Sequence, residues 1–155
     1  MVTRWWNEAN SVTTIFRHVR MLTNQEKEGV VAELSKHVRR CPEIVFALLH
    51  GSFLQPAGFR DIDVALYLDR ESDTPVDFRH YEADVGIELE MALKLPVDLR
   101  VLNDAPLAFR YHVLKGRPLL VRNLELFDDF RERTWDSYID FAPFARNYLR
   151  EAIGE

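Results

Sequence analysis

The 155-residue sequence predicts one α/β domain in which helices cover a small sheet mainly on one side. The first observation is the order of patterns along the chain. A segment of helical periodicity precedes an apolar run and an acidic alternating run, and a second helical segment precedes another acidic alternating run. The second observation is composition. Hydrophobic residues make up 47% and charged residues 29%, which is ordinary for a globular domain large enough to bury a core.

Residues 1–22 differ from the rest and are treated as an N-terminal extension. They hold three arginines against the single acid Glu8, and they contain the pair Trp5-Trp6. Two interpretations stay open: a short helix over residues 12–21 that packs at the edge of the domain, or an upstream start with Met21 as the usual first residue. Residues 23–122 are expected to form the domain proper, and residues 123–155 a C-terminal helical segment packed on it.

The first helix of the domain is predicted to begin after Thr23. Thr23 and Glu26 have the spacing of a capping box, in which side chain and backbone of the two residues bond reciprocally. The helix should end near Arg40, because Pro42 disfavours helical geometry in the residue before it. Its apolar residues recur at helical spacing: Val30, Val31, Leu34 and Val38.

A second helix is predicted from an N-cap at Thr74, followed by Pro75, to about Lys94. Its buried stripe is expected to contain Phe78, Tyr81, Val85, Leu89 and Ala92. A shorter helix should follow between Pro106 and Gly116, since glycine is favourable just after a helix end.

The C-terminal part begins with a short strand predicted over residues 118–121. From about Leu124 a long helical pattern runs nearly to the end of the chain, and Pro143 should kink or divide it. Its aromatic stripe is interpreted as core or as a surface for another protein copy or partner. The stripe consists of Phe127, Phe130, Tyr138 and Phe141.

The candidate site lies where the apolar run 44–49, a predicted buried strand, leads into Gly51-Ser52. Eight residues separate Ser52 from Asp61, and Asp61 and Asp63 stand at the start of an alternating run. Successive side chains of a strand point to opposite faces, so these two acids should share one face. The other face then takes Ile62, Val64, Leu66 and Leu68.

A third carboxylate, Asp98, lies in the second acidic alternating run, residues 97–102. Mg²⁺ prefers oxygen ligands and is usually bound through a few carboxylates and substrate phosphates. The Gly51-Ser52 turn offers backbone N–H groups and a hydroxyl to phosphate oxygens, since glycine permits close approach. The pattern therefore predicts a site for a metal ion and a nucleotide. His50, just before the turn, is interpreted as a packed or hydrogen-bonded strand residue.

These motifs resemble the signature of the DNA polymerase beta-like nucleotidyltransferase superfamily, over roughly residues 23–122. Within it the chain resembles the minimal nucleotidyltransferases (MNT) often found as antitoxins of HEPN–MNT toxin–antitoxin pairs. The resemblance implies the nucleotidyltransferase fold, with a small mixed sheet and a long C-terminal helical segment. The loop between Ser52 and Asp61 is shorter than the one common in the antitoxins, and it lacks the Arg-Gly that many relatives carry.

The resemblance also implies roles for the matching residues. Gly51 and Ser52 would bind the nucleoside triphosphate, ATP. Asp61, Asp63 and Asp98 would be the catalytic carboxylates and would ligate two Mg²⁺ ions. The implied reaction is transfer of AMP from ATP to a hydroxyl, often that of a tyrosine on the partner HEPN toxin.

Bulk properties narrow the function further. The net charge of −5 argues against a nucleic-acid partner, because phosphate neutralisation usually needs a basic surface. The single cysteine, Cys41, fits a reducing compartment. The chain carries neither an apolar run of membrane-spanning length nor the pattern of a signal peptide, so a cytoplasmic protein without a membrane partner is expected. A homo-oligomer stays open.

Two alternative functions also stay open. One is an antitoxin that neutralises its toxin by binding, with a catalytically weak or inactive site. The other is a nucleotidyltransferase acting on a small molecule such as an aminoglycoside, which would need an added domain or a deep pocket built by a dimer.

Overall fold

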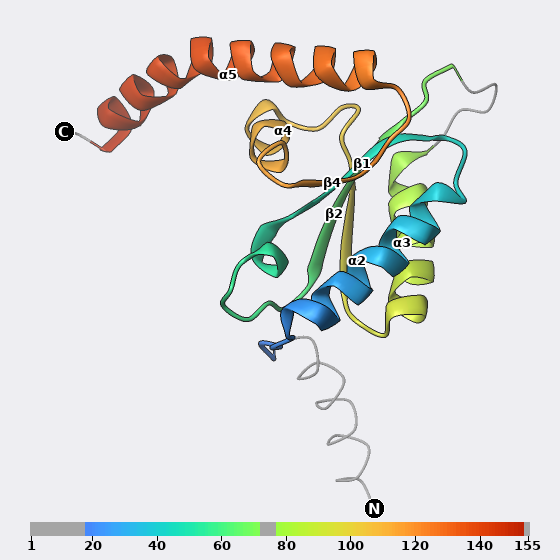
Figure 1. Cartoon of the computed structure of the whole chain (residues 1–155). Helices are drawn as coiled ribbons and strands as arrows, with labels where there is room; N and C mark the ends of the chain where they lie inside the picture. Colours follow the sequence, from blue (N-terminus) through green and yellow to red (C-terminus); the bar gives the residue numbers. More distant parts are fainter. Residues whose placement is uncertain (1–17, 72–76, 154–155) are drawn as a thin grey trace, which may run out of the picture.

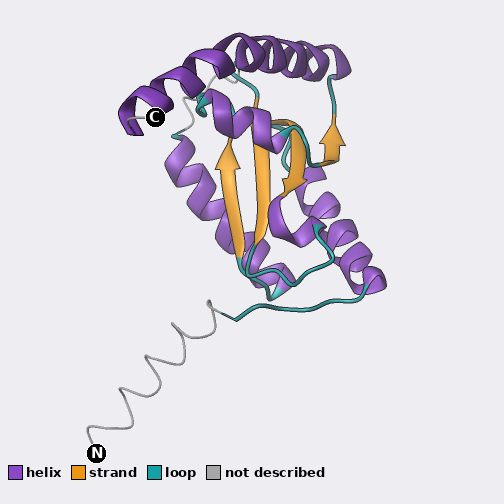
Figure 2. Ribbon diagram, turned by 90° about the vertical axis from the view of Figure 1, so that its left-hand side faces the viewer, coloured by secondary structure: helices purple, strands orange, loops and turns teal. Residues whose placement is uncertain are grey.

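A computed structural model describes residues 18–71 and 77–153 of the chain. Four strands form one mixed sheet in the order β3-β2-β1-β4 (Figure 2). The central strand β1 pairs antiparallel with β2 and with β4, whereas β2 pairs parallel with β3. The predicted class, with a small mixed sheet, is therefore confirmed. The strands are β1 (Ile44–His50), β2 (Ile62–Leu68), β3 (Val97–Val101) and β4 (Arg117–Val121).

Helices lie over both faces of this sheet (Figure 1). The two 16-residue helices α2 (Asn24–Arg39) and α3 (Phe78–Leu93) cover one face and bury the larger core against it. The short α4 (Leu107–Val113) and the first turns of α5 (Leu124–Ile153) cover part of the other face. The cover is therefore heavier on one side.

Strand β2 separates the two cores, as its alternating sequence predicted. Ile62, Val64, Leu66 and Leu68 belong to the larger core under α2 and α3. Ala65 belongs to the second core, where it lies with Phe46 and with Phe127 of α5. The face that carries Ala65 is also the face of Asp63, because positions two apart on a strand share a face. The alternation therefore directs Asp63 away from the larger core.

The start of α2 confirms the predicted capping box. The backbone N–H of Glu26 donates to Oγ1 of Thr23 at 3.2 Å, and the N–H of Thr23 donates to Oε2 of Glu26 at 2.7 Å. These reciprocal bonds satisfy donors that have no partner inside the helix. The helix ends at Arg39, one residue before the predicted end.

The predicted N-cap of the second helix is wrong. Asp77 caps α3, and its side chain accepts a hydrogen bond from the N–H of Arg79 at 3.0 Å. Thr74 and Pro75 lie outside the described residues. Asp and Thr are both good N-caps, so two competing caps stood close together in the sequence, and local pattern did not decide between them.

Helix α5 continues through Pro143 as one helix of 30 residues, so Pro143 does not divide it. Figure 1 shows its last turns bending as it runs past the body of the domain. A proline removes one backbone hydrogen bond, and the neighbouring Phe141 and Phe144 are exposed to solvent there. Across the described ranges, no helix has the length and apolar character that crossing a bilayer requires.

The helix predicted over residues 12–21 lies largely outside the described residues. Its described end, residues 18–21, is not helical. Arg20 instead forms a two-bond bridge with Phe59: its N–H donates to the Phe59 carbonyl at 2.7 Å, and its carbonyl accepts from the Phe59 N–H at 3.0 Å. This backbone pairing attaches the segment to the loop before β2 and replaces the helical bonds.

Candidate active site

The Gly-Ser motif forms a short 3₁₀ turn, η1 (Gly51–Leu54), that begins where β1 ends. Gly51 has φ of +78°, in the left-handed region that favours glycine. The space where a Cβ would stand is taken by the carboxylate of Asp63. Gly51 and Ser52 are exposed, whereas Phe53 is buried and fixes the turn to the core. The turn therefore presents its backbone to solvent directly beside an acid of β2.

Lys27 of α2 stabilises this turn through hydrogen bonds. Its Nζ donates to the carbonyls of Phe53 and Gln55, both at 2.8 Å. The ammonium also lies 5.3 Å from the centre of the Phe53 ring, within the range of a cation–π interaction. Sequence analysis did not identify Lys27, because a lysine in the first turns of an amphipathic helix has the pattern of a solvated side chain.

The predicted acids meet on adjacent strands. Asp61 immediately precedes β2, and Asp63 is its second residue. In the sheet Asp63 is paired with His50 of β1 on one side and with Asp98 of β3 on the other. The structure therefore brings Asp63, Asp98 and the Gly51 turn together, on strands separated by up to 47 positions in the sequence.

Burial and nearby negative charge raise the pKa of Asp63. Partial burial, and then the charges of Asp61 and Asp98, raise the pKa of Asp63 to about 6, and Arg100 opposes the rise. Arg100 is paired with Asp98 through a 3.0 Å bond from Nε to Oδ1. The charge of Arg100 does not cancel the rise at Asp63, so negative charge remains there that a bound cation would relieve.

The donor set fits a hard divalent cation. In the described parts of the chain, no three His, Cys, Asp or Glu side chains gather closely enough to hold a metal ion alone. Mg²⁺ commonly needs fewer, since one or two carboxylates hold it together with substrate phosphates and water. Asp61 and Asp63 provide oxygen ligands, and the raised pKa of Asp63 marks the charge that such an ion would neutralise.

A cavity of about 530 Å³ opens beside the two paired acids. Its charged lining consists of Asp63, Glu82, Asp98, Arg100 and Asp104, and His50 also lines it. Its apolar wall consists of Phe78, Val101, Ala105, Pro106 and Phe109. Burial lowers the pKa of His50, and His112 adds to the effect while Asp98 opposes it, so the imidazole is neutral at pH 7. Sequence analysis missed this wall because it assembles from α3, β3 and α4.

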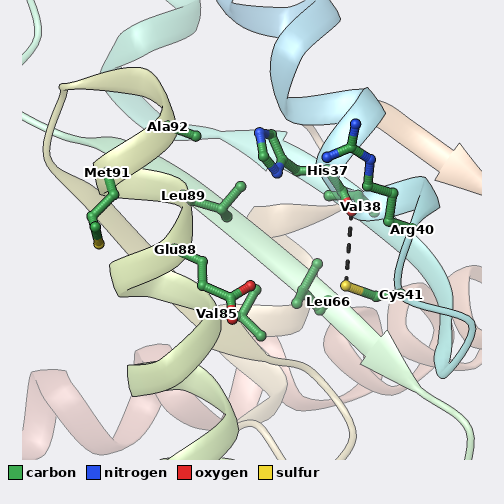
Figure 3. A pocket seen from close by; sticks show the side chains of 10 residues that line it. All are labelled: His37, Val38, Arg40, Cys41, Leu66, Val85, Glu88, Leu89, Met91 and Ala92. Carbon is green, nitrogen blue, oxygen red and sulfur yellow. Dashed lines mark hydrogen bonds between the residues drawn. The ribbon is translucent and has the colours of Figure 1, made fainter.

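A second pocket of about 510 Å³ lies between α2 and α3 (Figure 3). It is on the opposite side of the sheet from Asp63, because Leu66 belongs to the larger core. Its lining is mainly apolar, with Leu66 of β2 at its base and Glu88 at its rim. The thiol of Cys41 lies 3.8 Å from the carbonyl of His37. Burial raises the pKa of this thiol, which makes it a poor nucleophile.

A carboxylate pair beside a Gly-Ser turn on a mixed sheet is an arrangement suited to nucleotidyl transfer. Residues 32–125 match the family model described as Polymerase beta, Nucleotidyltransferase. The chain therefore belongs to the polymerase beta nucleotidyltransferase family, as its motifs predicted.

Solved structures of this fold include toxin–antitoxin complexes. This chain is similar to a chain in the complex of the tri-AMPylated Shewanella oneidensis HEPN toxin with MNT antitoxin. The TM-score is 0.64 and the identity 20%, and the match covers 82% of this chain and 98% of that chain. A toxin–antitoxin structure with AMP-PNP has a TM-score of 0.65 and 22% identity, with coverage of 79% of this chain and 98% of that one. The toxin–antitoxin MntA–HepT has a TM-score of 0.63 and 20% identity, with coverage of 81% of this chain and 98% of that one. At these identities the likeness concerns the fold. A search of curated proteins gave no match to the sequence.

Proposed function

We propose that this protein is a cytoplasmic, Mg²⁺-dependent nucleotidyltransferase that transfers AMP from ATP to a tyrosine of a HEPN toxin, and so acts as the antitoxin of the pair. The observation that carries the proposal is the close approach of Asp63 to both the Gly51 turn and Asp98. A triphosphate on the turn and an acceptor beside Asp98 would then meet at one carboxylate. Structures of the same fold are described as complexes with an AMPylated HEPN toxin and with AMP-PNP.

In the proposed reaction the acceptor hydroxyl oxygen attacks the α-phosphorus of ATP. A new O–P bond forms, the bond from the α-phosphorus to the bridging oxygen breaks, pyrophosphate leaves, and the hydroxyl proton passes to a nearby base. The backbone N–H groups and hydroxyl at Gly51-Ser52 would bind the triphosphate. Asp98 would lie near the attacking oxygen, and Arg100 holds the Asp98 carboxylate in place.

Asp61, Asp63 and Asp98 are the residues proposed to hold Mg²⁺, with two ions as the expected number. Bound there, Mg²⁺ would neutralise the phosphate charge that develops during transfer. The protein's contribution is to hold Asp63 on β2 next to the turn that would carry the phosphates, with Asp61 immediately before the strand.

The exposed end of α5 supports a protein partner. Phe144 and Tyr148 are each 72% exposed, and they lie four residues apart on one face of the last turns of α5. Apolar side chains that gather on an exposed surface are typical of interaction sites. The proposal assigns this surface to the HEPN toxin, with a second copy of the chain as the alternative.

The decisive experiment mixes the purified protein with its cognate HEPN protein, Mg²⁺ and ATP labelled on the α-phosphate. Label should appear on the HEPN protein, and Asp61→Asn or Asp63→Asn should abolish it while the fold stays intact by circular dichroism. Omitting Mg²⁺ should have the same effect. Absence of transfer by the folded wild-type protein, with every nucleoside triphosphate tried, would overturn the proposal.

A second candidate function is neutralisation by binding alone. It is favoured by the pairing of Asp98 with Arg100, which occupies one of the proposed metal ligands. This candidate predicts that the Asp61→Asn/Asp63→Asn double variant still co-purifies with the HEPN protein and still protects cells from it. Loss of protection by a folded double variant that still binds would exclude it.

A further inference from the structure

We propose that His50 is a specificity-determining residue. Together with Phe109 it forms the subsite that binds the phenol group of the acceptor, its aromatic ring and its hydroxyl. The proposal rests on the proposed function and deepens it, because it identifies side chains outside the Gly-Ser and acidic motifs that would recognise the acceptor. It concerns binding and orientation of the acceptor rather than the transfer of a proton.

His50 is a buried polar residue, and one of its ring nitrogens, Nε2, has no hydrogen-bond partner among the described residues. It is the last residue of β1, it is 8% exposed, and it lines the cavity beside Asp63. No described residue accepts from or donates to its Nε2. Buried polar side chains in folded proteins nearly always have a hydrogen-bond partner, and one that lacks it calls for an explanation. This nitrogen is closed off from water in the unliganded protein, so a small rotation of the ring would bring it to the adjoining cavity, where a ligand hydroxyl would provide the missing hydrogen-bond partner.

Phe109 gives the subsite its preference for a ring. Its ring meets the His50 imidazole edge to face, with centroids 5.7 Å apart. Both rings line the same cavity, together with the apolar side chains Val101 and Ala105. A phenol ring would add to this edge-to-face arrangement, and such pairs contribute beyond the area they bury. A serine side chain is too short to cover the apolar wall and would leave it in contact with water.

The position of the cavity assigns it to the acceptor rather than to the nucleotide's phosphates. The residues proposed to bind phosphates, Gly51 and Ser52, are exposed on the turn. The cavity instead extends past Asp63 to Asp98, on the β3 side of the site. A phenol on Phe109 would therefore point its hydroxyl at the region between His50 and Asp98, opposite the expected triphosphate.

Binding can be measured without turnover. The imidazole signals of the five histidines are followed by NMR while N-acetyl-tyrosinamide is added to the full-length protein, and His50→Gln assigns the His50 signal. The tyrosine probe should shift that signal in a saturable way. N-acetyl-phenylalaninamide, which lacks the hydroxyl, should bind about fivefold to tenfold more weakly, the loss expected for one neutral hydrogen bond. An unmoved His50 signal, or equal binding of the two probes, would overturn the proposal.

Kinetics on the HEPN protein provide the second test. His50→Ala should raise KM for the HEPN protein about tenfold, while the affinity for AMP-PNP stays within twofold of wild type. His50→Gln, which keeps a hydrogen-bonding group, should recover most of the loss. The matched control is His80→Ala, whose side chain is 84% exposed on α3 and should leave KM unchanged. A KM unaffected by His50→Ala would count against the subsite.

The two tests separate failure of this subsite from failure of the proposed function. If the wild-type protein transfers no AMP but the tyrosine probe shifts the His50 signal, the proposed reaction is wrong and the phenol subsite stands. If AMP is transferred and neither His50→Ala nor the probes have an effect, the reaction stands and the subsite is wrong.

Discussion

The carboxylate of Asp63 fills the space where a Cβ of residue 51 would stand. This approach is possible because residue 51 is a glycine with φ of +78° at the exact end of β1, where the chain leaves the sheet. It joins two motifs that are separate in the sequence, the Gly-Ser turn and the acidic strand. The geometry of the candidate site therefore depends on an absent side chain as much as on the acids themselves.

Gly51→Ala should disrupt the site with a limited cost to the fold. The new methyl group would displace the Asp63 carboxylate, and alanine is disfavoured at positive φ, so a loss of about 1–3 kcal/mol in the free energy of unfolding is expected. AMP transfer should fall at least tenfold. Gly29→Ala is the matched control, since that position in α2 has open space around it and alanine favours helix. If Gly51→Ala transferred AMP at the wild-type rate, the position of the Asp63 carboxylate beside residue 51 would not be needed for the reaction.

The raised pKa of Asp63 predicts how stability depends on pH. The pKa of Asp63 is about 6 in the folded protein against an ordinary value of 3.8, so the folded state binds this proton more tightly. Stability of the metal-free protein should therefore fall as pH rises from about 4 to 6 and stay lower above that range. Because Asp63 is only half-buried, solvent screening reduces the expected effect to on the order of 1 kcal/mol.

Asp63→Asn removes this ionisation and should be more stable than wild type at pH 8, with a smaller difference at pH 4. Urea unfolding at the two pH values, in buffer with a metal chelator, measures both. Asp84→Asn, at an exposed position of α3, serves as the control and should follow the wild-type profile. Equal stability of wild type and Asp63→Asn at pH 8 would show that the charge at Asp63 is already compensated.

Lys27→Met should loosen the Gly-Ser turn. The variant loses the two bonds to the carbonyls of Phe53 and Gln55, each charge-assisted, at a cost of about 1–3 kcal/mol in unfolding free energy. A less ordered turn should raise KM for ATP several-fold and change KM for the HEPN protein little. Lys36→Met, an exposed lysine of the same helix, is the control. An unchanged KM for ATP would mean that the turn orders itself without Lys27.

Sequence pattern was sufficient for much of this fold because its signals are local. The capping box at Thr23 and the alternation along 62–68 each depend on neighbours within a few residues, and both are confirmed. The N-cap of α3 was missed because Asp77 and Thr74 offered similar local chemistry. The isolated bridge between Arg20 and Phe59 joins distant backbone groups, which side-chain pattern does not encode.

In the candidate site, too, the residues in local motifs were predicted, whereas those that depend on tertiary packing were not. Gly51, Asp61, Asp63 and Asp98 stand in short motifs and were predicted, and the structure brings Asp63 beside both Gly51 and Asp98. The roles of Lys27 and Phe109 depend on how α2 and α4 pack on the sheet. His50 was interpreted as a packed or hydrogen-bonded strand residue; it is packed at the end of β1, but its Nε2 has no hydrogen-bond partner among the described residues. Satisfaction of a buried polar group is a property of the folded surroundings, which one sequence does not display.

The exposed aromatic end of α5 provides the last prediction. Phe127, near the start of this helix, packs against the domain at 7% exposure, whereas Phe144 and Tyr148, near its end, are each 72% exposed. Phe144→Asp should leave the unfolding free energy within about 0.5 kcal/mol of wild type, because the side chain has little to lose in the isolated protein. Binding to the HEPN protein, measured by titration calorimetry, should weaken at least tenfold if this surface is the interface. The control is Ala32→Asp, which adds the same charge at an exposed position of α2, on the other side of the sheet from α5, and should bind normally. Undiminished binding by Phe144→Asp, together with a change from dimer to monomer in sedimentation, would reassign the surface to a second copy of this chain.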